Sequence, residues 1–133
     1  MSVSGSISSP LTAPTRLRVV MAQQDFLVGD IPGNTELVIA SVHKALEEHQ
    51  ADIVVFPELC LTGYPPEDLL LRPSLDIRIS EALERLLAEK LPCAVVVGAP
   101  IREAGLLYNA AVVIDHGKLA GRCCSCGREL TND

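Results

Sequence analysis

The fold of this chain is indicated first by the run Asp52-Ile53-Val54-Val55-Phe56, which is nearly all apolar and rich in β-branched residues. A short run of this composition is typical of a central strand that is covered on both faces. Glu58 follows this run through Pro57. The carboxylate of Glu58 is therefore predicted to lie just beyond the carboxyl end of a buried strand.

The residues before this strand predict a second strand and a helix. The run Leu17–Ala22 is a short β-branched segment, and Gly29–Gly33 has the composition of a turn. Asn34 is a plausible N-cap, because its side-chain oxygen can accept from the free backbone N–H groups of the next helix. That helix is predicted to run to about Gln50. Its apolar stripe consists of Val38, Val42, Ala45 and Leu46.

The residues after the central strand continue the alternation of strands and helices. A long loop over Pro57–Pro73 leads to a helix near Leu75–Lys90. Glu67 and Asp68 follow two prolines within this loop and could begin a short helix, where capping is at least as plausible a role as substrate contact. The second helix carries an apolar stripe of Ile79, Leu83, Leu86 and Leu87.

The carboxyl-terminal part predicts further strands. Cys93–Gly98 is a third buried strand, and Leu106–Ile114 with Lys118–Arg122 forms a hairpin that turns at Asp115–Gly117. Two βα units followed by a hairpin predict an α/β fold with a mixed sheet.

Composition and charge narrow the function classes. The 133 residues are 48% hydrophobic and 21% charged, which suits one globular domain, and the net charge is −6. The eleven Lys and Arg residues are scattered, so nucleic acid is not expected as a partner. No run approaches the roughly 20 apolar residues that span a bilayer, and Met1–Thr15 lacks the features of a signal peptide. The sequence therefore predicts a soluble cytoplasmic protein with no membrane contact.

The cysteines and histidines give no clear metal site. Five cysteines without a secretory signal indicate reduced thiols. Cys123, Cys124 and Cys126 could suggest zinc, but a structural zinc site needs four ligands, usually as two separated pairs. The alternative is a cysteine-rich end without catalytic meaning. Three histidines lack a partner at metal-ligand spacing and are expected at the solvated surface: His43, His49 and His116.

The position of Glu58 is compatible with both a catalytic and a structural role. Reactive groups in open α/β sheets collect beyond the carboxyl ends of the strands, where the loops surround a crevice. Glu58 could act there as a general base. The alternative is that Glu58 merely ends a strand and accepts hydrogen bonds from the loop backbone. Tyr108 and Asn109 could similarly line a pocket, although a tyrosine on a strand is more often packed in the core.

The sequence around Glu58 resembles a known catalytic motif. The segment Val54–Leu71, which reads VVFPELCLTGYPPEDLLL, resembles the first motif of nitrilase-superfamily amidases. Its part Gly63–Leu70 is similar to the glutaminase domain of the glutamine-dependent NAD synthetase family in particular. Three further groups of residues agree with this resemblance: Met21–Gln24 with Val28–Ile31 and Gly33–Asn34, then Val96–Pro100, then Leu107–Ala111.

This resemblance, which runs from about Leu17 to Arg122, implies a nitrilase-like αββα sandwich of which about the first half is present. It implies an amidase that releases ammonia from glutamine by means of a glutamate, a lysine and a nucleophilic cysteine. Glu58 corresponds to the glutamate and is the catalytic residue that can be assigned. In the family, a second domain uses ATP and magnesium to convert deamido-NAD to NAD. The resemblance assigns no cofactor or metal to this chain itself.

The end of the chain departs from the family pattern. The family's lysine lies in a segment resembling Lys-Arg-Glu-Leu-Pro-Asn, and this chain has Gly127 at the position of the lysine. Lys118 does not match that position, and the family's cysteine lies beyond Asp133. These features predict three parts: a disordered tail over residues 1–15, a partial amidase domain over 16–122 and an atypical cysteine-rich end over 123–133. They also predict that the chain alone is inactive, with a truncated or frame-disturbed end.

Three functions therefore stay open at the level of sequence. The first is the glutaminase part of a glutamine-dependent NAD synthetase, with glutamine as substrate and a homo-oligomer as a compatible assembly. The second is another amidase of the same superfamily. The third is a non-catalytic binding or interaction remnant, which the missing lysine and cysteine would explain.

Overall fold

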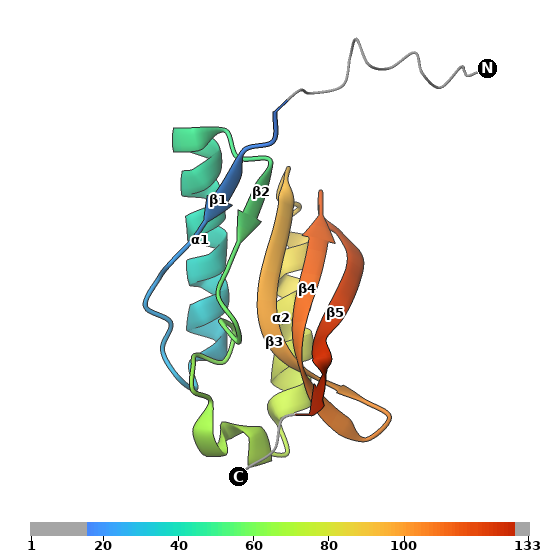
Figure 1. Ribbon diagram of the computed structural model, residues 1–133. Helices are drawn as coiled ribbons and strands as arrows, with labels where there is room; N and C mark the ends of the chain where they lie inside the picture. Colours follow the sequence, from blue (N-terminus) through green and yellow to red (C-terminus); the bar gives the residue numbers. More distant parts are fainter. Residues whose placement is uncertain (1–15, 130–133) are drawn as a thin grey trace, which may run out of the picture.

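The computed structural model describes residues 16–129, which form one mixed sheet and two long helices (Figure 1). The strands are β1 (Val19–Met21), β2 (Ile53–Val55), β3 (Ala94–Glu103), β4 (Leu106–Asp115) and β5 (Lys118–Glu129). The helices are α1 (Ile31–His49), α2 (Leu75–Ala88) and the short 3-10 helix η2 (Glu67–Leu71). The predicted strands, both predicted helices and the short helix after the paired prolines are therefore confirmed.

The five strands follow their sequence order, β1-β2-β3-β4-β5, across the sheet. β1, β2 and β3 are parallel, with Val20 opposite Val54 and Val54 opposite Val95. β3, β4 and β5 are antiparallel neighbours. Two βα units thus supply the parallel part, because a parallel connection needs a crossover helix, and the hairpins supply the antiparallel part.

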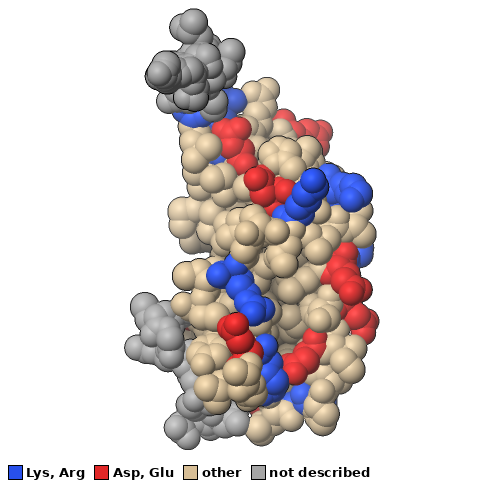
Figure 2. Space-filling view, turned by 90° about the vertical axis from the view of Figure 1, so that its right-hand side faces the viewer, with Lys and Arg blue, Asp and Glu red and all other residues tan. Residues whose placement is uncertain are grey.

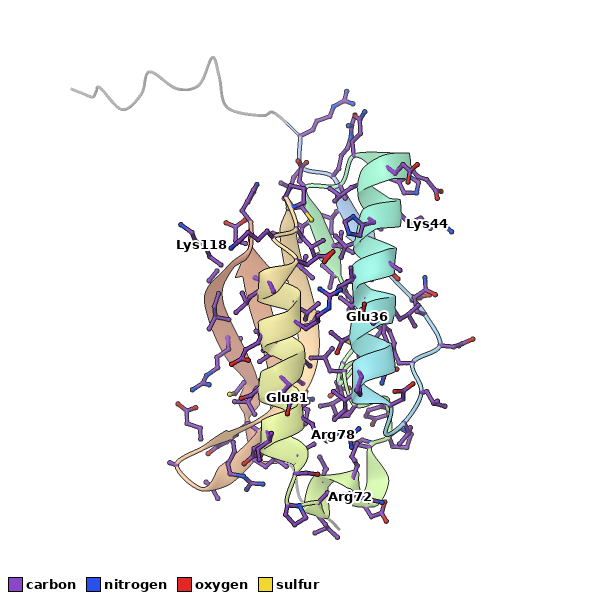
Figure 3. All side chains as sticks on the ribbon, turned by 180° about the vertical axis from the view of Figure 1, so that it is seen from behind. Glu36, Lys44, Arg72, Arg78, Glu81 and Lys118 are labelled. Atoms are coloured by element: carbon purple, nitrogen blue, oxygen red, sulfur yellow. The ribbon has the colours of Figure 1, made fainter. Side chains whose placement is uncertain are left out.

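Both long helices cover the same face of the sheet. They lie behind the strands in Figure 1 and in front of them in Figure 3. Strand side chains that point toward the helices are fully buried, as Val54, Val95 and Val97 are. The helices complete this core with their apolar stripes: Val38, Val42 and Ala45 on α1, and Leu75, Ile79, Ala82 and Leu86 on α2. Full burial of each such large aliphatic side chain stabilises the fold by roughly 1.5 to 3 kcal/mol.

The opposite face of the sheet is not covered by any helix of residues 16–129. Successive strand residues point to opposite faces, so the neighbours of the buried valines face this side. Ile53 and Val55 are only partly buried, and Val19 and Met21 are 50% and 72% exposed. The described residues therefore have one layer of helices and one sheet, and the second sheet face is an apolar surface.

Helix α1 begins earlier than the sequence indicates. Its N-cap is Asp30, whose carboxylate accepts from the backbone N–H of Gly33 at 3.0 Å. The prediction of Asn34 as the N-cap is therefore wrong. Pro32 lies in the first turn of the helix, where a missing N–H has no cost. Asn34 is buried instead, and its side chain holds the loop before the helix.

A second hairpin, which the sequence did not indicate, joins β3 to β4. β3 runs to Glu103, well beyond the predicted end at Gly98, and pairs with β4 along ten residues. The chain turns at Ala104 and Gly105, both with positive φ. The glycine and proline at positions 98 and 100 resemble strand breakers, which explains why the strand was predicted too short.

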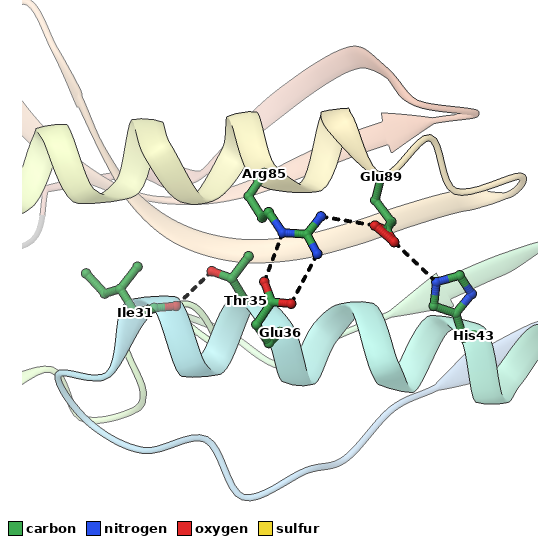
Figure 4. A network of polar contacts seen from close by, with 6 residues as sticks. All are labelled: Ile31, Thr35, Glu36, His43, Arg85 and Glu89. Atoms are coloured by element: carbon green, nitrogen blue, oxygen red, sulfur yellow. Dashed lines mark hydrogen bonds and ion pairs between the residues drawn. The ribbon is translucent and has the colours of Figure 1, made fainter.

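A polar network joins the solvent-exposed edges of the two helices (Figure 4). The guanidinium of Arg85 on α2 donates to both carboxylate oxygens of Glu36 on α1, at 3.0 and 3.1 Å, and to Glu89 at 3.0 Å. His43 of α1 lies 3.7 Å from Glu89. The hydrogen bond from Arg85 is the main reason that the pKa of Glu89 is lowered. This network fixes the position of α2 against α1 at the surface.

Surface charges of both signs are interspersed. Figure 2 shows Lys and Arg beside Asp and Glu over the face that it draws, without a continuous basic area. Two ion pairs join exposed side chains: Arg102 with Asp76 at 2.8 Å, and Arg122 with Glu103 at 3.1 Å. None of the helices within residues 16–129 has both the length and the apolar character to cross a bilayer.

Candidate active site

Glu58 lies where the sequence predicts it, three residues after the end of β2. Its side chain is exposed and borders a hollow of about 400 Å³ on the uncovered face of the sheet. Strand residues of β2, β3 and β4 form the floor of this hollow, including Val55, Val96 and Ala111. The carboxylate of Glu58 thus lies at the edge of a depression whose other described lining residues are mostly apolar, at the carboxyl ends of parallel strands, where α/β proteins bind ligands.

The loop that carries Glu58 packs directly on β3 at Gly98. The backbone N–H of Leu61 donates to the carbonyl oxygen of Gly98 at 3.1 Å. A Cβ atom on Gly98 would collide with the backbone nitrogen of Leu59 and would lie 2.8 Å from the carbonyl oxygen of Pro57. Only a glycine allows the loop backbone to approach the strand this closely. Gly98 therefore determines how close the loop that carries Glu58 lies to β3.

Cys60 also holds this loop against β3. Its side chain is 1% exposed, and its Sγ lies 3.4 Å from the backbone nitrogen and 3.7 Å from the carbonyl oxygen of Gly98. Burial raises the pKa of the Cys60 thiol to about 11. The thiol is therefore protonated at neutral pH and packs as a small apolar group. Cys60 does not provide a nucleophile, although it is only two residues from Glu58.

Asn109 on β4 is the side chain that contacts Glu58 most directly. Its Nδ2 donates a hydrogen bond to Oε1 of Glu58. Both side chains line the hollow of about 400 Å³ on the uncovered face of the sheet, which is called the larger hollow below. The hypothesis that Asn109 lines a pocket is thus confirmed. Its neighbour Tyr108 is half-buried and does not border this hollow.

A second hollow, of about 250 Å³, borders Glu58 on the other side of its loop. It is lined by Gln24, Asp25, Phe26, Pro57, Glu58, Cys60 and Tyr64. The segment before α1 is held here by the side chain of Asn34, which accepts from the N–H of Leu27 and donates to the carbonyl of Leu61. Sequence reasoning missed this role of Asn34, because its pattern also fits an N-cap.

The loop after Glu58 also packs closely against the segment before α1. A Cβ atom on Gly63 would lie 2.7 Å from the backbone nitrogen and Cα of Val28, and Gly63 has φ of +80°. Thr62 is fully buried, and its carbonyl accepts from the N–H of Gly29 at 3.0 Å. The loop that follows Glu58, which is part of the segment that resembles the family motif, is therefore held firmly in place.

The two lysine positions considered from the sequence differ in their relation to Glu58. Lys118 begins β5 and pairs with Asp115, which is six residues along β4 from Asn109. At about 3.4 Å per residue, this separation is roughly 20 Å. The backbone at Gly127 lies in the part of β5 that bulges opposite Asn109, between the pairs Ala110–Cys124 and Tyr108–Glu129. The position that resembles the family's lysine is therefore opposite Asn109 in the sheet, but it carries glycine.

The remaining candidate ligands do not form a metal centre within residues 16–129. No group of three or more His, Cys, Asp or Glu side chains with metal-binding geometry occurs among the described residues. Cys123 is a free, exposed thiol that borders the larger hollow, and Cys124 is free and partly buried. The side chain of Cys126 lies outside the described part. His43, His49 and His116 are exposed, as predicted.

The segment after the paired prolines forms a short helix that packs against the core, and no side chain caps its start. η2 covers Glu67–Leu71, and its Leu69 is buried in the core. Asp68 is exposed and lines neither hollow beside Glu58. The side chain of Glu67 lies outside the described part. Substrate contact by Asp68 therefore finds no support in this arrangement.

The fold and the site define a class of protein. Residues 16–123 match the carbon-nitrogen hydrolase family, so the chain belongs to that family. An amidase from Nesterenkonia sp. has the same fold, with a TM-score of 0.73 at 22% identity, over 87% of this chain and 45% of the amidase. The predicted nitrilase-like fold, of which the chain holds a part, is confirmed.

Within this family, several proteins similar to the chain are glutamine-dependent NAD(+) synthetases. It is 45% identical over 113 residues to the glutamine-dependent NAD(+) synthetase of Xanthomonas campestris, covering 85% of this chain and 20% of the relative. The Xylella fastidiosa enzyme of the same name is 47% identical over 103 residues. The structure of the Acinetobacter baumannii glutamine-dependent NAD+ synthetase gives a TM-score of 0.76 at 36% identity, over 81% of this chain. The chain spans about a fifth of the length of these relatives.

Proposed function

We propose that this chain supplies the carboxylate-bearing part of a glutaminase site in a glutamine-dependent NAD synthetase. The observation that carries the proposal is the placement of Glu58 beyond the end of β2, at the edge of a hollow and hydrogen-bonded by Asn109. The names of the similar enzymes support the choice of glutamine as the amide substrate. In this proposal, residues 16–122 are the partial amidase domain, and residues 123–133 are an atypical end.

The chemistry proposed for Glu58 is that of a general base. Its carboxylate takes the proton from a cysteine thiol, and the resulting thiolate attacks the amide carbon of glutamine. The C–N bond then breaks, and ammonia leaves with a proton that the same carboxyl group returns. A lysine ammonium would stabilise the negative oxygen of the tetrahedral intermediate. We assign neither the lysine nor the cysteine to a described residue, because Gly127 stands at one position and the Cys60 thiol is buried and protonated.

ATP and magnesium belong, in this proposal, to a synthetase domain. No group of three or more His, Cys, Asp or Glu side chains among the described residues could hold the magnesium ion, and no reaction step on this chain passes through either group. We further infer a cytoplasmic location, which the four free thiols among the described cysteines support. A homo-oligomer that covers the open sheet face is compatible with the same proposal.

A chimera tests this function. Residues 16–123 replace the matching segment of the Xanthomonas campestris enzyme, whose remaining parts supply the other residues of the site. We expect this chimera to make NAD from deamido-NAD with glutamine as the nitrogen source. Loss of the glutamine-dependent rate, with an unchanged ammonia-dependent rate, would contradict the proposal.

A second candidate is another amidase of the superfamily, which the fold of the Nesterenkonia protein favours. The chimera separates the two, because a different amidase specificity would release ammonia from a simple aliphatic amide faster than from glutamine. A non-catalytic role predicts no amide hydrolysis from either substrate. The distinction requires only that ammonia release be measured with both amides in the same preparation.

A further inference from the structure

Asn109 occupies one of the irregular positions in the pairing of β4. On one side its partner is Pro100 of β3, which has no N–H to donate. On the other side the pairing with β5 shifts register between Tyr108 and Ala110. Bulges of this kind occur often beside active sites, where they change the direction of a side chain. The sheet is therefore irregular at the one β4 residue whose side chain reaches Glu58.

The hydrogen bond from Asn109 is the one polar contact of the Glu58 side chain found among the described residues. Its Nδ2 donates to Oε1, and Oε2 has no side-chain partner among the described side chains. Gln24 and Tyr64 share the smaller hollow with Glu58 without bonding to it. One carboxylate oxygen is thus held by a donor from the sheet, and the side chain as a whole borders both hollows.

We propose that Asn109 is a positioning residue for Glu58. By donating to Oε1, the amide orients the carboxylate and keeps Oε2 as the oxygen that receives the thiol proton. A donor to an ionised carboxylate makes a stronger hydrogen bond than a neutral pair does. This inference rests on the proposed function, because it assigns Asn109 a role in the same proton transfer.

A simpler role for Asn109 would be to tie the Glu58 loop to the sheet. The loop, however, is already fixed by Gly98, whose carbonyl accepts from Leu61 at 3.1 Å, and by the buried Cys60. Removing the amide of Asn109 should therefore leave the loop in place while the carboxylate turns. The two roles differ in what they predict for the rate, the KM and the pH dependence.

The first experiment uses the chimera with three variants. Asn109→Leu keeps the approximate size of the side chain without its donor, and Glu58→Gln removes the base. Tyr108→Phe is the matched control on the same strand. Asn109→Leu should lower kcat for glutamine by about 10- to 100-fold with little change in KM, because a misdirected base slows the chemical step. The ammonia-dependent rate should not change in any variant.

The pH profile separates positioning from a structural tie. In Asn109→Asp, two carboxylates face each other at neutral pH, so the donor is lost and like charges repel. When the pH is lowered, the introduced carboxyl group takes a proton and can donate again. The rate of Asn109→Asp, relative to the unchanged chimera at the same pH, should therefore recover as the pH falls. A ratio that stays constant with pH would overturn the positioning role.

The second experiment tests the contact in the full 133-residue chain, independently of activity. The infrared difference between the chain and its Glu58→Gln variant isolates the carboxylate stretching band of Glu58. The same difference recorded in an Asn109→Leu background should show this band shifted, because the hydrogen bond is gone. An unshifted band would overturn the inference. If Glu58→Gln leaves the glutamine-dependent rate unchanged, the proposed function fails, whereas a loss in Glu58→Gln without one in Asn109→Leu defeats the positioning role alone.

Discussion

Gly98→Ala is a severe test of how the sheet positions Glu58. The added Cβ would overlap the backbone nitrogen of Leu59 and lie 2.8 and 3.0 Å from backbone atoms of Pro57 and Glu58. All of these are backbone atoms, so no side-chain rotation can relieve the overlap. Overpacking of this kind typically costs about 1 to 3 kcal/mol. The loop must move outward, and a displacement of about 1 Å at a reacting group can lower a rate about 100-fold.

Two assays measure these effects. Chemical denaturation of the full chain should show a lower free energy of unfolding for Gly98→Ala than for Gly121→Ala, since a Cβ on Gly121 meets no atom within 4 Å. In the chimera, Gly98→Ala should lower the glutamine-dependent rate while the ammonia-dependent rate is retained. Equal stability of the two variants, together with an unchanged glutamine-dependent rate, would refute the claim that contact with β3 sets the position of Glu58.

Three further predictions concern stability and association. Asn34→Ala should destabilise the chain by about 1 to 3 kcal/mol in urea unfolding, because buried loop groups lose their partners; an unchanged midpoint would show that these hydrogen bonds contribute nothing. The pKa of Glu89 is lowered mainly by Arg85, so this pair's stabilisation is present above the pKa of the unfolded chain and is lost as the pH falls through the folded value. The Tm difference between the chain and Glu89→Gln should then shrink on acidification, and a constant difference would argue against the pair. The open sheet face predicts self-association, which Met21→Lys should reduce in sedimentation more than Ile77→Lys, a control of similar exposure on α2; equal effects would point to another surface.

Most of the fold could be predicted from the sequence because its elements have strong local patterns. The apolar run of β2 and the stripes of both long helices are periodic enough to identify their type. The start of α1 was harder, because Asp30 and Asn34 both have capping side chains and the tertiary contacts of Asn34 decide between them. The length of β3 was missed because Gly98 and Pro100 suit a turn unless the neighbouring loop and strand are known.

The site could be predicted only in part. Glu58 follows a clear strand signal and lies in a segment that resembles a family motif, so its position could be inferred. The roles of Gly98 and Asn109 depend on contacts between residues that are 40 and 51 positions from Glu58. Such contacts come from the pairing of β2, β3 and β4, which no local pattern encodes. A lone glycine or asparagine in a strand gives no signal that distinguishes it from a structural residue.

The most direct test of the central claim is the effect of Glu58→Gln in the chimera on two rates. Glutamine keeps the size of the side chain and an oxygen that accepts from Asn109, but it cannot take the thiol proton. The glutamine-dependent rate should fall by about 100- to 10,000-fold, which is the usual contribution of a general base. The ammonia-dependent rate should stay unchanged, and Asp68→Asn should alter neither. Equal loss of both rates with loss of folded protein, or no loss of either, would contradict the assignment of Glu58 as the base.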